Sequence, residues 1–370
     1  MRSSWHARLP DILIAALSGR ALAAAARASG CKPLVADFFG DMDTREIAAE
    51  SCVVEGDFER GFEAGPLLAA LERLARGRRP LGVVAGTGFE DRPALLDEFA
   101  RRWPLIGNNG ATVALVKDPM SFAALCAAAG VPHPATSLAP PPSGADWLVK
   151  QAGGSGGCHI ELFAGQRAAA GRYFQERMQG VPVSLLVLAN GAAGQVLGAS
   201  RQWADPSGLA RHRYGGALRP WSGPALQHMH AAALSLIPPA NLRGLASFDF
   251  LVHSDHFTLL EINPRPGATL DIFTHPQLFA AHIAACAGKL PKNPLDFPDA
   301  QAAAIVYCEH DIAQMPALDW PVWACDRQHG GTRLRSGDPL CTITSRARGP
   351  GAARRLLDRR IALIRVQPGQ

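Results

Sequence analysis

The sequence predicts a mixed fold in which an α/β domain with a parallel sheet comes first and a strand-rich α+β region follows. Short apolar segments alternate with helical segments up to residue 107, strands and glycine-rich loops dominate residues 147–273, and a small α+β unit ends the chain. With 370 residues, 48% of them hydrophobic and 19% charged, the chain is long enough for two or three packed units and too apolar to be disordered.

The first 107 residues show the alternation that builds a parallel sheet with helices on both faces. We expect strands at residues 12–16, 33–38, 52–54 and 81–85, and helices at residues 21–29, 66–76 and 92–101. Ligands of such sheets bind beyond the carboxyl ends of the strands. The turn after the first strand has a single glycine, so no dinucleotide site is expected. Its residues Ser18, Gly19 and Arg20 are either candidates to contact a second substrate or ordinary turn residues.

The pattern changes at residue 108. We expect a loop at residues 108–110, helices at 121–129, 224–236 and 352–358, and late strands at 303–307 and 340–345. The predicted division is therefore a first domain of residues 1–107, a second of residues 108–295 and a C-terminal α+β unit of residues 296–370.

The composition of the chain limits the kinds of ligand and the cellular setting that we expect for it. The net charge of +5 has no basic run behind it, which favours small anionic ligands such as nucleotides over nucleic acid. The eight cysteines include no C-x-x-C pair, which favours buried thiols in a reducing cytosol. No segment approaches 18 uninterrupted apolar residues, so we predict a cytoplasmic protein that does not enter a membrane.

A segment that ends in Lys150 leads into a loop with four glycines. The loop Gly153-Gly154-Ser155-Gly156-Gly157, called the glycine loop here, allows backbone N–H groups to approach a phosphate, and Lys150 adds a point charge. A flexible hairpin is the alternative. Only five of the 37 basic residues are lysines, so a lysine at this position stands out in a chain that otherwise uses arginine.

Two apolar segments joined through residues 253–256 each carry an acid. Glu261 and Asn263 are two residues apart, so both project from one face of a strand, and Asp249 can lie beside them on the neighbouring strand. Three oxygen ligands on one face suit Mg²⁺ that bridges nucleotide phosphates, since two buried carboxylates without a cation would be costly. A hairpin face exposed to water is the alternative.

The order of these segments resembles the ATP-grasp superfamily, in which two α+β subdomains hold ATP between them. The resemblance covers residues 108–275, and residues 11–107 are similar to the Rossmann-like domain that precedes such folds. It implies a small lid subdomain at 108–180, a metal-binding subdomain at 181–295, and ATP with Mg²⁺ as cofactors, where Mn²⁺ can replace Mg²⁺.

The resemblance also implies a role for each motif, with Lys150 and Arg265 as catalytic residues. Arg265 would steady the transferred phosphoryl group. The nucleotide would be bound by Lys117, Lys150, Gly153, Gly154, Ser155, Gly156, Gly157, Gln175, Glu176 and Met178, and the metal by Asp249, Glu261 and Asn263. The chain departs from the family pattern at residues 181–184, Val-Pro-Val-Ser, where many relatives place an acid that holds the ribose.

Within the superfamily the chain most resembles the carboligase-like branch, which includes the tyramine–glutamate ligase of methanofuran synthesis and ligases of one-carbon-cofactor (methanofuran and tetrahydromethanopterin) biosynthesis. This resemblance rests on residues 17–20, 36–41 and 213–217. It implies an ATP-dependent ligase that couples a carboxylate to an amine, with glutamate as one candidate acid. A bicarbonate-dependent carboxylase-like enzyme and a non-catalytic nucleotide-binding regulator are the alternatives.

The second substrate has its own candidates. Arg211, Arg213 and Arg219 lie in a glycine-bearing stretch, where they either bind a substrate carboxylate or are exposed loop residues. His159 follows the glycine loop and is a candidate for a supporting or a catalytic role. The expected partners are small-molecule carboxylate and amine substrates, and a homodimer is compatible with the resemblance.

Overall fold

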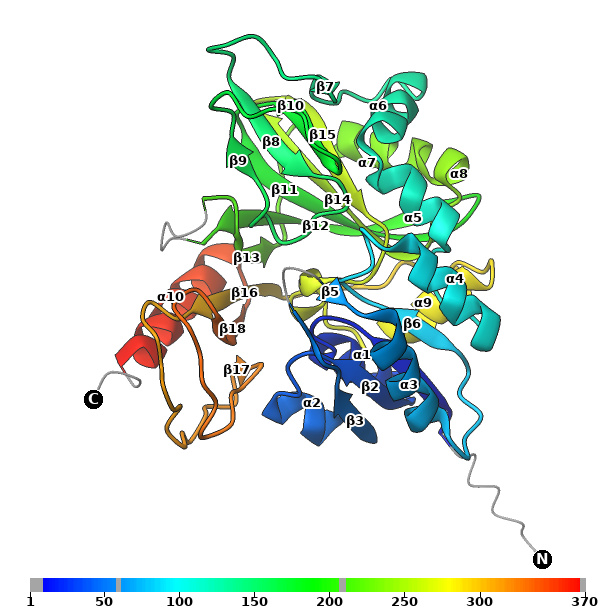
Figure 1. Cartoon of the computed structure of the whole chain (residues 1–370), viewed down its shortest axis with the longest axis vertical. Coiled ribbons are helices and arrows are strands. Elements are labelled where there is room, and N and C mark those ends of the chain that lie inside the picture. Colours follow the sequence, from blue (N-terminus) through cyan, green and yellow to red (C-terminus); the bar gives the residue numbers. More distant parts are fainter. Residues whose placement is uncertain (1–8, 58–60, 206–210, 367–370) are drawn as a thin grey trace, which may run out of the picture.

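The computed structural model describes residues 9–57, 61–205 and 211–366, and it begins with a four-stranded parallel sheet (Figure 1). The strands, in the order β3-β2-β1-β6, are β1 (Asp11–Ala15), β2 (Lys32–Asp37), β3 (Glu50–Val53) and β6 (Val83–Ala85). They are accompanied by α1 (Arg20–Ala28), α2 (Met42–Ile47), α3 (Ala64–Ala75), α4 (Pro93–Arg102) and a small hairpin of β4 (Gly56–Asp57) and β5 (Gly61–Phe62). The predicted α/β fold of this part is confirmed.

The strand order of this sheet creates a crevice at its carboxyl edge. Because β1 lies between β2 and β6, the chain leaves β1 and β6 toward opposite sides, and such a switch point is where ligands bind in open α/β sheets. The sequence did not reveal α2, whose six residues show no apolar period. Its start is set by Asp41, whose side chain accepts a hydrogen bond from the Thr44 amide at 2.8 Å.

Two helices lead into a second sheet, which we call the lid. The helices are α5 (Gly110–Lys117) and α6 (Pro119–Ala128), and the lid strands, in the order β7-β10-β8-β9, are β7 (Thr136–Ser137), β10 (Arg172–Glu176), β8 (Trp147–Gln151) and β9 (Glu161–Leu162). The sequence predicted only a loop at residues 108–110, and α5 was missed. Asn109 caps it, because its side chain accepts a hydrogen bond from the Thr112 amide at 2.9 Å.

The largest sheet has eight strands in the order β15-β14-β11-β12-β13-β16-β18-β17. These are β11 (Val181–Asn190), β12 (Gly194–Ala204), β13 (Tyr214–Arg219), β14 (Arg243–His253), β15 (His256–Asn263), β16 (Ala300–Tyr307), β17 (Ala324–Cys325) and β18 (Pro339–Ala347). The helices of this region are α7 (Leu226–Ser235), α8 (Ile237–Ala240), the 3₁₀ turn η1 (Ala268–Asp271), α9 (Leu278–Cys286) and α10 (Pro350–Val366), which packs on β16 and β18 (Figure 1). Because β13 pairs with β16, the sheet runs on across residue 295 into the C-terminal unit.

The two faces of the large sheet bury different neighbours, as the two-residue period of a strand requires. Leu186 and Leu188 of β11 belong to the same core cluster as Leu22 of α1, so the first domain and the large sheet share a core. Leu185, one residue away, belongs instead to the cluster that contains Met229 of α7.

Within residues 9–57, 61–205 and 211–366, no single helix is long and apolar enough to cross a membrane. Only α5 and α6 together have the length and composition, and the two are bent by 83° relative to each other.

Candidate active site between the lid and the large sheet

Asp249, Glu261 and Asn263, which we call the oxygen set, lie on one face of the β14–β15 pair. Asp249 and Glu261 are direct partners in the register of the two strands. The Asn263 amide donates to Asp249 Oδ2 at 2.9 Å and to Glu261 Oε1 at 3.2 Å. Ser184 of β11 donates to Asp249 Oδ1 at 2.5 Å. The three residues that the sequence placed on one face are therefore in mutual contact.

The two carboxyl groups of the oxygen set have opposite pKa shifts. Burial, followed by repulsion from Glu261, raises the pKa of Asp249 to about 6. Burial also acts to raise the pKa of Glu261, but the charge of Lys117 and its hydrogen bond outweigh it, and the pKa falls to about 2. The pair thus carries more negative charge at neutral pH than its one bonded lysine offsets, and a divalent cation would relieve the excess.

Lys117 connects the end of α5 to the oxygen set. Its Nζ donates to Glu261 Oε2 and to Asn263 Oδ1, both at 2.9 Å, and its side chain is only 6% exposed. Glu261 is more open, with 42% of its side chain exposed. The ammonium group therefore lies between the protein core and an accessible carboxylate, where it adds a compact positive charge.

Lys150 and Gln175 form a second buried polar contact, inside the lid. They lie on the paired strands β8 and β10, and Lys150 Nζ donates to Gln175 Oε1 at 2.7 Å. Burial lowers the pKa of Lys150, the charge of Lys117 acts in the same direction, and Glu261 opposes both. The charges of Lys117 and Glu261 therefore both act on Lys150. Of the other expected hinge residues, Glu176 is exposed and Met178 is half-buried.

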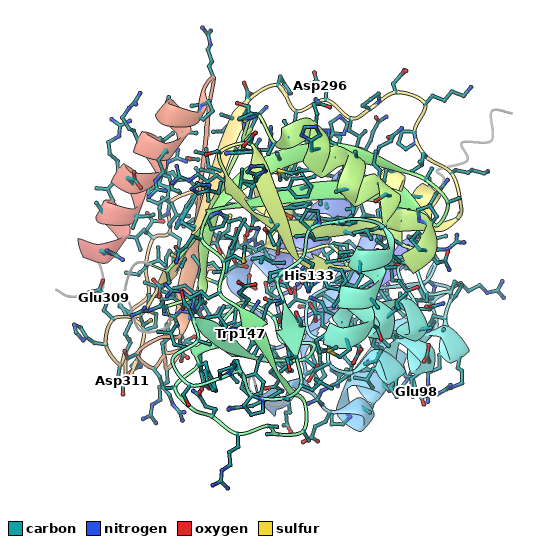
Figure 2. All side chains as sticks on the ribbon, turned by 90° about the horizontal axis from the view of Figure 1, so that it is seen from above. Glu98, His133, Trp147, Asp296, Glu309 and Asp311 are labelled. Carbon is teal, nitrogen blue, oxygen red and sulfur yellow. The ribbon has the colours of Figure 1, made fainter. Side chains whose placement is uncertain are left out.

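The glycine loop packs against two other segments of the protein. A Cβ on Gly153 would lie 2.6 Å from the Asp91 Cα, and one on Gly157 would lie 1.9 Å from the His212 carbonyl oxygen. The Gly156 carbonyl accepts a hydrogen bond from the Tyr214 amide at 3.0 Å. Gly153 and Gly157 therefore have no room for a side chain, and the glycine loop is docked on both segments, an arrangement that we call closed. Seen from above, Trp147 of the lid lies between Glu98 of α4 and Glu309 of the C-terminal unit (Figure 2).

His159 lies directly behind the glycine loop. A Cβ on Gly154 would lie 2.6 Å from the His159 ring, and His159 Nδ1 is buried without a hydrogen-bond partner among the described residues. Burial lowers the pKa of His159, so the ring is neutral at pH 7.

Arg265 is held by a residue that the sequence did not single out. Glu90, in the loop after β6, accepts a hydrogen bond from Arg265 Nε at 2.7 Å, and their side chains are 3% and 15% exposed, respectively. Arg265 Nη2 also lies 3.4 Å from Asn263 Oδ1, which links Arg265 to the oxygen set. The sequence signal that could have indicated Glu90 is an acidic residue in a glycine-bearing loop at the switch point of the sheet. Its partner Arg265 lies 175 residues later in the chain, so no local pattern links the two.

The candidate substrate residues have other partners in this structure. Arg20 donates hydrogen bonds to both Asp271 and Asp326. Ser18 Oγ lies 3.3 Å from Asp326 Oδ1. Gly19 donates its amide to Asp37 at 3.0 Å.

The three arginines of the glycine-bearing stretch differ in exposure. Arg213 is buried, bonded to Asp205 and to the Gly337 carbonyl, and stacked on the Tyr307 ring at 3.6 Å. Arg219 is buried and bonds the carbonyl oxygens of Ile272 and Phe297. Only Arg211 is exposed. Arg213 and Arg219 are therefore not the exposed loop residues that one alternative described, and their guanidinium groups already have partners within the protein.

The donors of this site fit Mg²⁺ and nucleotide phosphates. The carboxylates of the oxygen set offer the hard oxygen ligands that Mg²⁺ prefers, and the glycine loop presents backbone that a Cβ at Gly153 or Gly157 would obstruct. Within the described parts of the chain, no cluster of three or more His, Cys, Asp or Glu side chains is suited to a metal ion. A Mg²⁺ ion in a nucleotide site is typically bound by one or two carboxylates and completes its coordination with phosphate oxygens and water, which matches the two carboxylates of the oxygen set.

Comparison with known proteins places this geometry in a known fold. Residues 118–269 match the model of the ATP-grasp domain family. The chain superposes on biotin carboxylase from Campylobacter jejuni over 93% of its own length and 88% of that chain, with a TM-score of 0.71 and 15% identity. It also superposes on N5-carboxyaminoimidazole synthetase from Staphylococcus aureus over 95% of its own length and 97% of that chain, with a TM-score of 0.69 and 14% identity.

A third similar structure is much longer than this chain. Pyruvate carboxylase from Rhizobium etli matches 95% of this chain with a TM-score of 0.72 and 16% identity, but this chain spans only 39% of that enzyme. No curated protein matches the sequence. At these identities the likeness shows the fold, and the fold is that of an ATP-grasp protein with an α/β domain before it.

Proposed function

We propose that this protein is an ATP-dependent ligase that activates a carboxylate as an acyl phosphate and couples it to an amine. The observation that carries the proposal is the oxygen set, with Lys117 bonded to it and Arg265 beside it. A carboxylate pair that lacks a full complement of positive charge, next to a closed glycine loop, is suited to a cation and the phosphates that it bridges.

In the first step a carboxylate oxygen of the substrate attacks the γ-phosphorus of ATP, and the bond between that phosphorus and the oxygen of ADP breaks. Lys117 and Lys150 offset the charge of the phosphate oxygens, and the glycine loop excludes water and orients the γ-phosphate. Asp249 and Glu261, with Asn263, would hold Mg²⁺, which would supply further positive charge to the phosphates when bound. Arg265 steadies the acyl phosphate.

In the second step the amine nitrogen attacks the acyl carbon. The bond between that carbon and the phosphate oxygen breaks, phosphate leaves, and the nitrogen loses a proton. Support for an amine comes from the resemblance to the carboligase-like branch at residues 17–20, 36–41 and 213–217. Glutamate as the acid, and a place in one-carbon-cofactor synthesis, rest on the same resemblance.

A bicarbonate-dependent reaction is the second candidate, because biotin carboxylases and an N5-carboxyaminoimidazole synthetase are among the similar structures. A regulator that only binds nucleotide is less well supported, since a sensor would not need a complete oxygen set. The domain division, the roles of the hinge residues 175–178, a homodimer and a cytoplasmic location remain part of the proposal.

The test measures release of ADP and phosphate from Mg-ATP with three additions: glutamate plus tyramine, other acid–amine pairs, and bicarbonate alone. We expect release that requires both an acid and an amine, and amide product in equal amount. Release with bicarbonate and no amine would instead support the carboxylase-like reaction, and Mg-ATP binding without hydrolysis under any condition would support the regulator.

A pair of lysine variants makes this test specific. Lys150→Ala should lower turnover by at least 10²-fold, because the removed ammonium group is part of the electrostatic stabilisation of the phosphoryl group. Lys292→Ala, at one of the three remaining lysines, is the control and should keep full activity. Full activity of Lys150→Ala would contradict the assigned site.

A further inference from the structure

Glu90 is the one acidic side chain of the first domain that contacts Arg265 among the described residues. It follows β6 at the switch point of the parallel sheet. One carboxylate oxygen accepts the amides of Gly88 at 2.7 Å and Phe89 at 2.9 Å, and the other accepts Arg265 Nε at 2.7 Å. Both oxygens thus have partners, and the orientation of the carboxylate is determined by the backbone of its own loop.

We infer that Glu90 is a positioning residue that holds the Arg265 guanidinium toward the transferred phosphoryl group and links that placement to closure of the glycine loop. The inference rests on the proposed function, because it assumes that Arg265 meets the phosphoryl group. It adds a residue of the preceding domain to a site whose other members come from α5, the lid, the large sheet and the loop that follows β15.

The contact geometry supports orientation of Arg265 by Glu90. A guanidinium that donates through Nε to one carboxylate has both outer nitrogens left for other acceptors. Nη2 points to Asn263 of the oxygen set, and Nη1 lies against Gly267, where a Cβ would be only 2.1 Å from it. Without Glu90, the flexible arginine side chain would lose the one short hydrogen bond that restricts its rotation.

The charges around Glu90 also support its role in orienting Arg265. Burial acts to raise its pKa, but the charges of Arg265 and Lys117 and the two backbone amides outweigh burial and lower it. Glu90 is therefore ionised at neutral pH although its side chain is 3% exposed. A buried carboxylate of this kind keeps its arginine in place strongly, because separation would leave each charge unpaired.

The same loop is also the surface on which the glycine loop closes. A Cβ on Gly153 would lie 2.7 Å from the Glu90 carbonyl oxygen and 2.6 Å from the Asp91 Cα. The backbone that orients the Glu90 carboxylate is therefore in contact with the loop that covers the phosphates. If the glycine loop opens, the backbone of residues 90 and 91 loses its packing contact with Gly153. The Glu90 carboxylate is then less firmly placed, and so is the Arg265 side chain bonded to it.

The experiment uses the whole protein and needs no knowledge of its substrates. Calorimetry compares the affinity for Mg-ADP alone with that for Mg-ADP plus aluminium fluoride, which imitates a phosphoryl group in transfer. The variants are Glu90→Gln, Glu90→Asp and, as a control, Glu98→Gln on α4, where the Glu98 side chain is 33% exposed and pairs with Arg101 and Arg102 of the same helix.

We expect Glu90→Gln to bind Mg-ADP within about twofold of the wild type and to lose about 10²-fold of the extra affinity that aluminium fluoride provides. Glu90→Asp should recover part of that loss, and Glu98→Gln should match the wild type. In an Arg265→Ala background Glu90→Gln should cause no further loss, because a residue that acts through another is not additive with it.

Two results would overturn the inference. Equal losses of Mg-ADP and aluminium fluoride affinity would indicate a general structural role for Glu90, and no loss of either would show that Arg265 does not need it. A wild-type protein that binds Mg-ADP no tighter with aluminium fluoride would also contradict the inference. A wild-type protein that binds no Mg-ADP at all would instead refute the proposed function itself.

Discussion

Asp249 lies directly opposite Glu261 across the β14–β15 pair, and the same environment raises the pKa of the first to about 6 and lowers that of the second to about 2. Lys117 bonds Glu261, whereas among the described residues Asp249 accepts hydrogen bonds from the uncharged Ser184 hydroxyl and Asn263 amide. The negative charge that no bonded lysine offsets is therefore concentrated on Asp249, and cation binding is most favourable there.

Replacing Asp249 by Asn should remove the Mg²⁺ dependence of nucleotide binding. We expect affinity for ATP in the presence of Mg²⁺ to fall at least tenfold, while affinity without Mg²⁺ stays equal or rises, because a negative charge near the phosphates is lost. Calorimetry with and without Mg²⁺ measures both. Asp255→Asn, in the turn of the same hairpin with 70% of its side chain exposed, is the matched control. Equal Mg²⁺ dependence in the two variants would contradict a metal role for Asp249.

Gly153→Ala should weaken closure of the glycine loop, and Gly156→Ala provides an internal control. Both glycines have φ of +72°, so alanine introduces the same backbone strain at each. A Cβ collides with the Asp91 backbone only at Gly153, and at Gly156 it enters open space. We expect Mg-ATP hydrolysis to fall at least tenfold more in Gly153→Ala than in Gly156→Ala. Similar losses would show that strain, and not docking on Asp91, limits the loop.

Arg20→Ala should destabilise the protein by about 3 kcal/mol, because it leaves Asp271 and Asp326, whose side chains are only 10% and 23% exposed, without their shared cation. Those two residues come from η1 and from the C-terminal unit, so Arg20 joins three parts of the chain. Arg78→Ala is the control: Arg78 is itself 31% exposed and pairs with Glu50 at 2.8 Å and with Asp11 at 3.6 Å, so the loss should stay below about 1 kcal/mol. Urea unfolding of both variants measures the difference, and equal losses would argue against the role of Arg20.

The raised pKa of the buried Asp37 carboxyl group predicts that the stability of the protein depends on pH. Burial raises its pKa to about 7, although the amides of Gly19 and Gly40 act against this rise. The folded state therefore binds this proton more tightly than the unfolded state, so the contribution is complete near pH 4 and is lost as pH rises through 7. Relative to Asp37→Asn, the wild type should lose up to about 4 kcal/mol of unfolding free energy between pH 4 and 8.

Urea unfolding at several pH values measures this difference. Asp358→Asn on α10, where the Asp358 side chain is 51% exposed, should follow the wild type at every pH. A constant gap between the wild type and Asp37→Asn would show that Asp37 keeps an ordinary pKa in the folded protein.

Local patterns were enough for much of the fold. The alternation of apolar and helical segments predicted the parallel sheet of the first domain, and the two-residue period of a strand predicted that Glu261 and Asn263 share a face. Elements without such a period were missed: α2 is too short to show one, and the start of α5 depends on the Asn109 cap. The roles assigned to the candidate residues remain predictions.

The sequence by itself determined which side chains each strand and loop presents, because those directions follow from periods of a few residues. Only the tertiary structure decided which of them meet. Glu90 and Arg265 lie 175 positions apart, and Arg20 and Asp326 lie 306 apart. Their pairing depends on how the first domain, the lid and the large sheet pack around a shared core, and no local pattern encodes that packing. The long-range contacts therefore turned Arg20 from a substrate candidate into an ion-paired link between three parts of the chain.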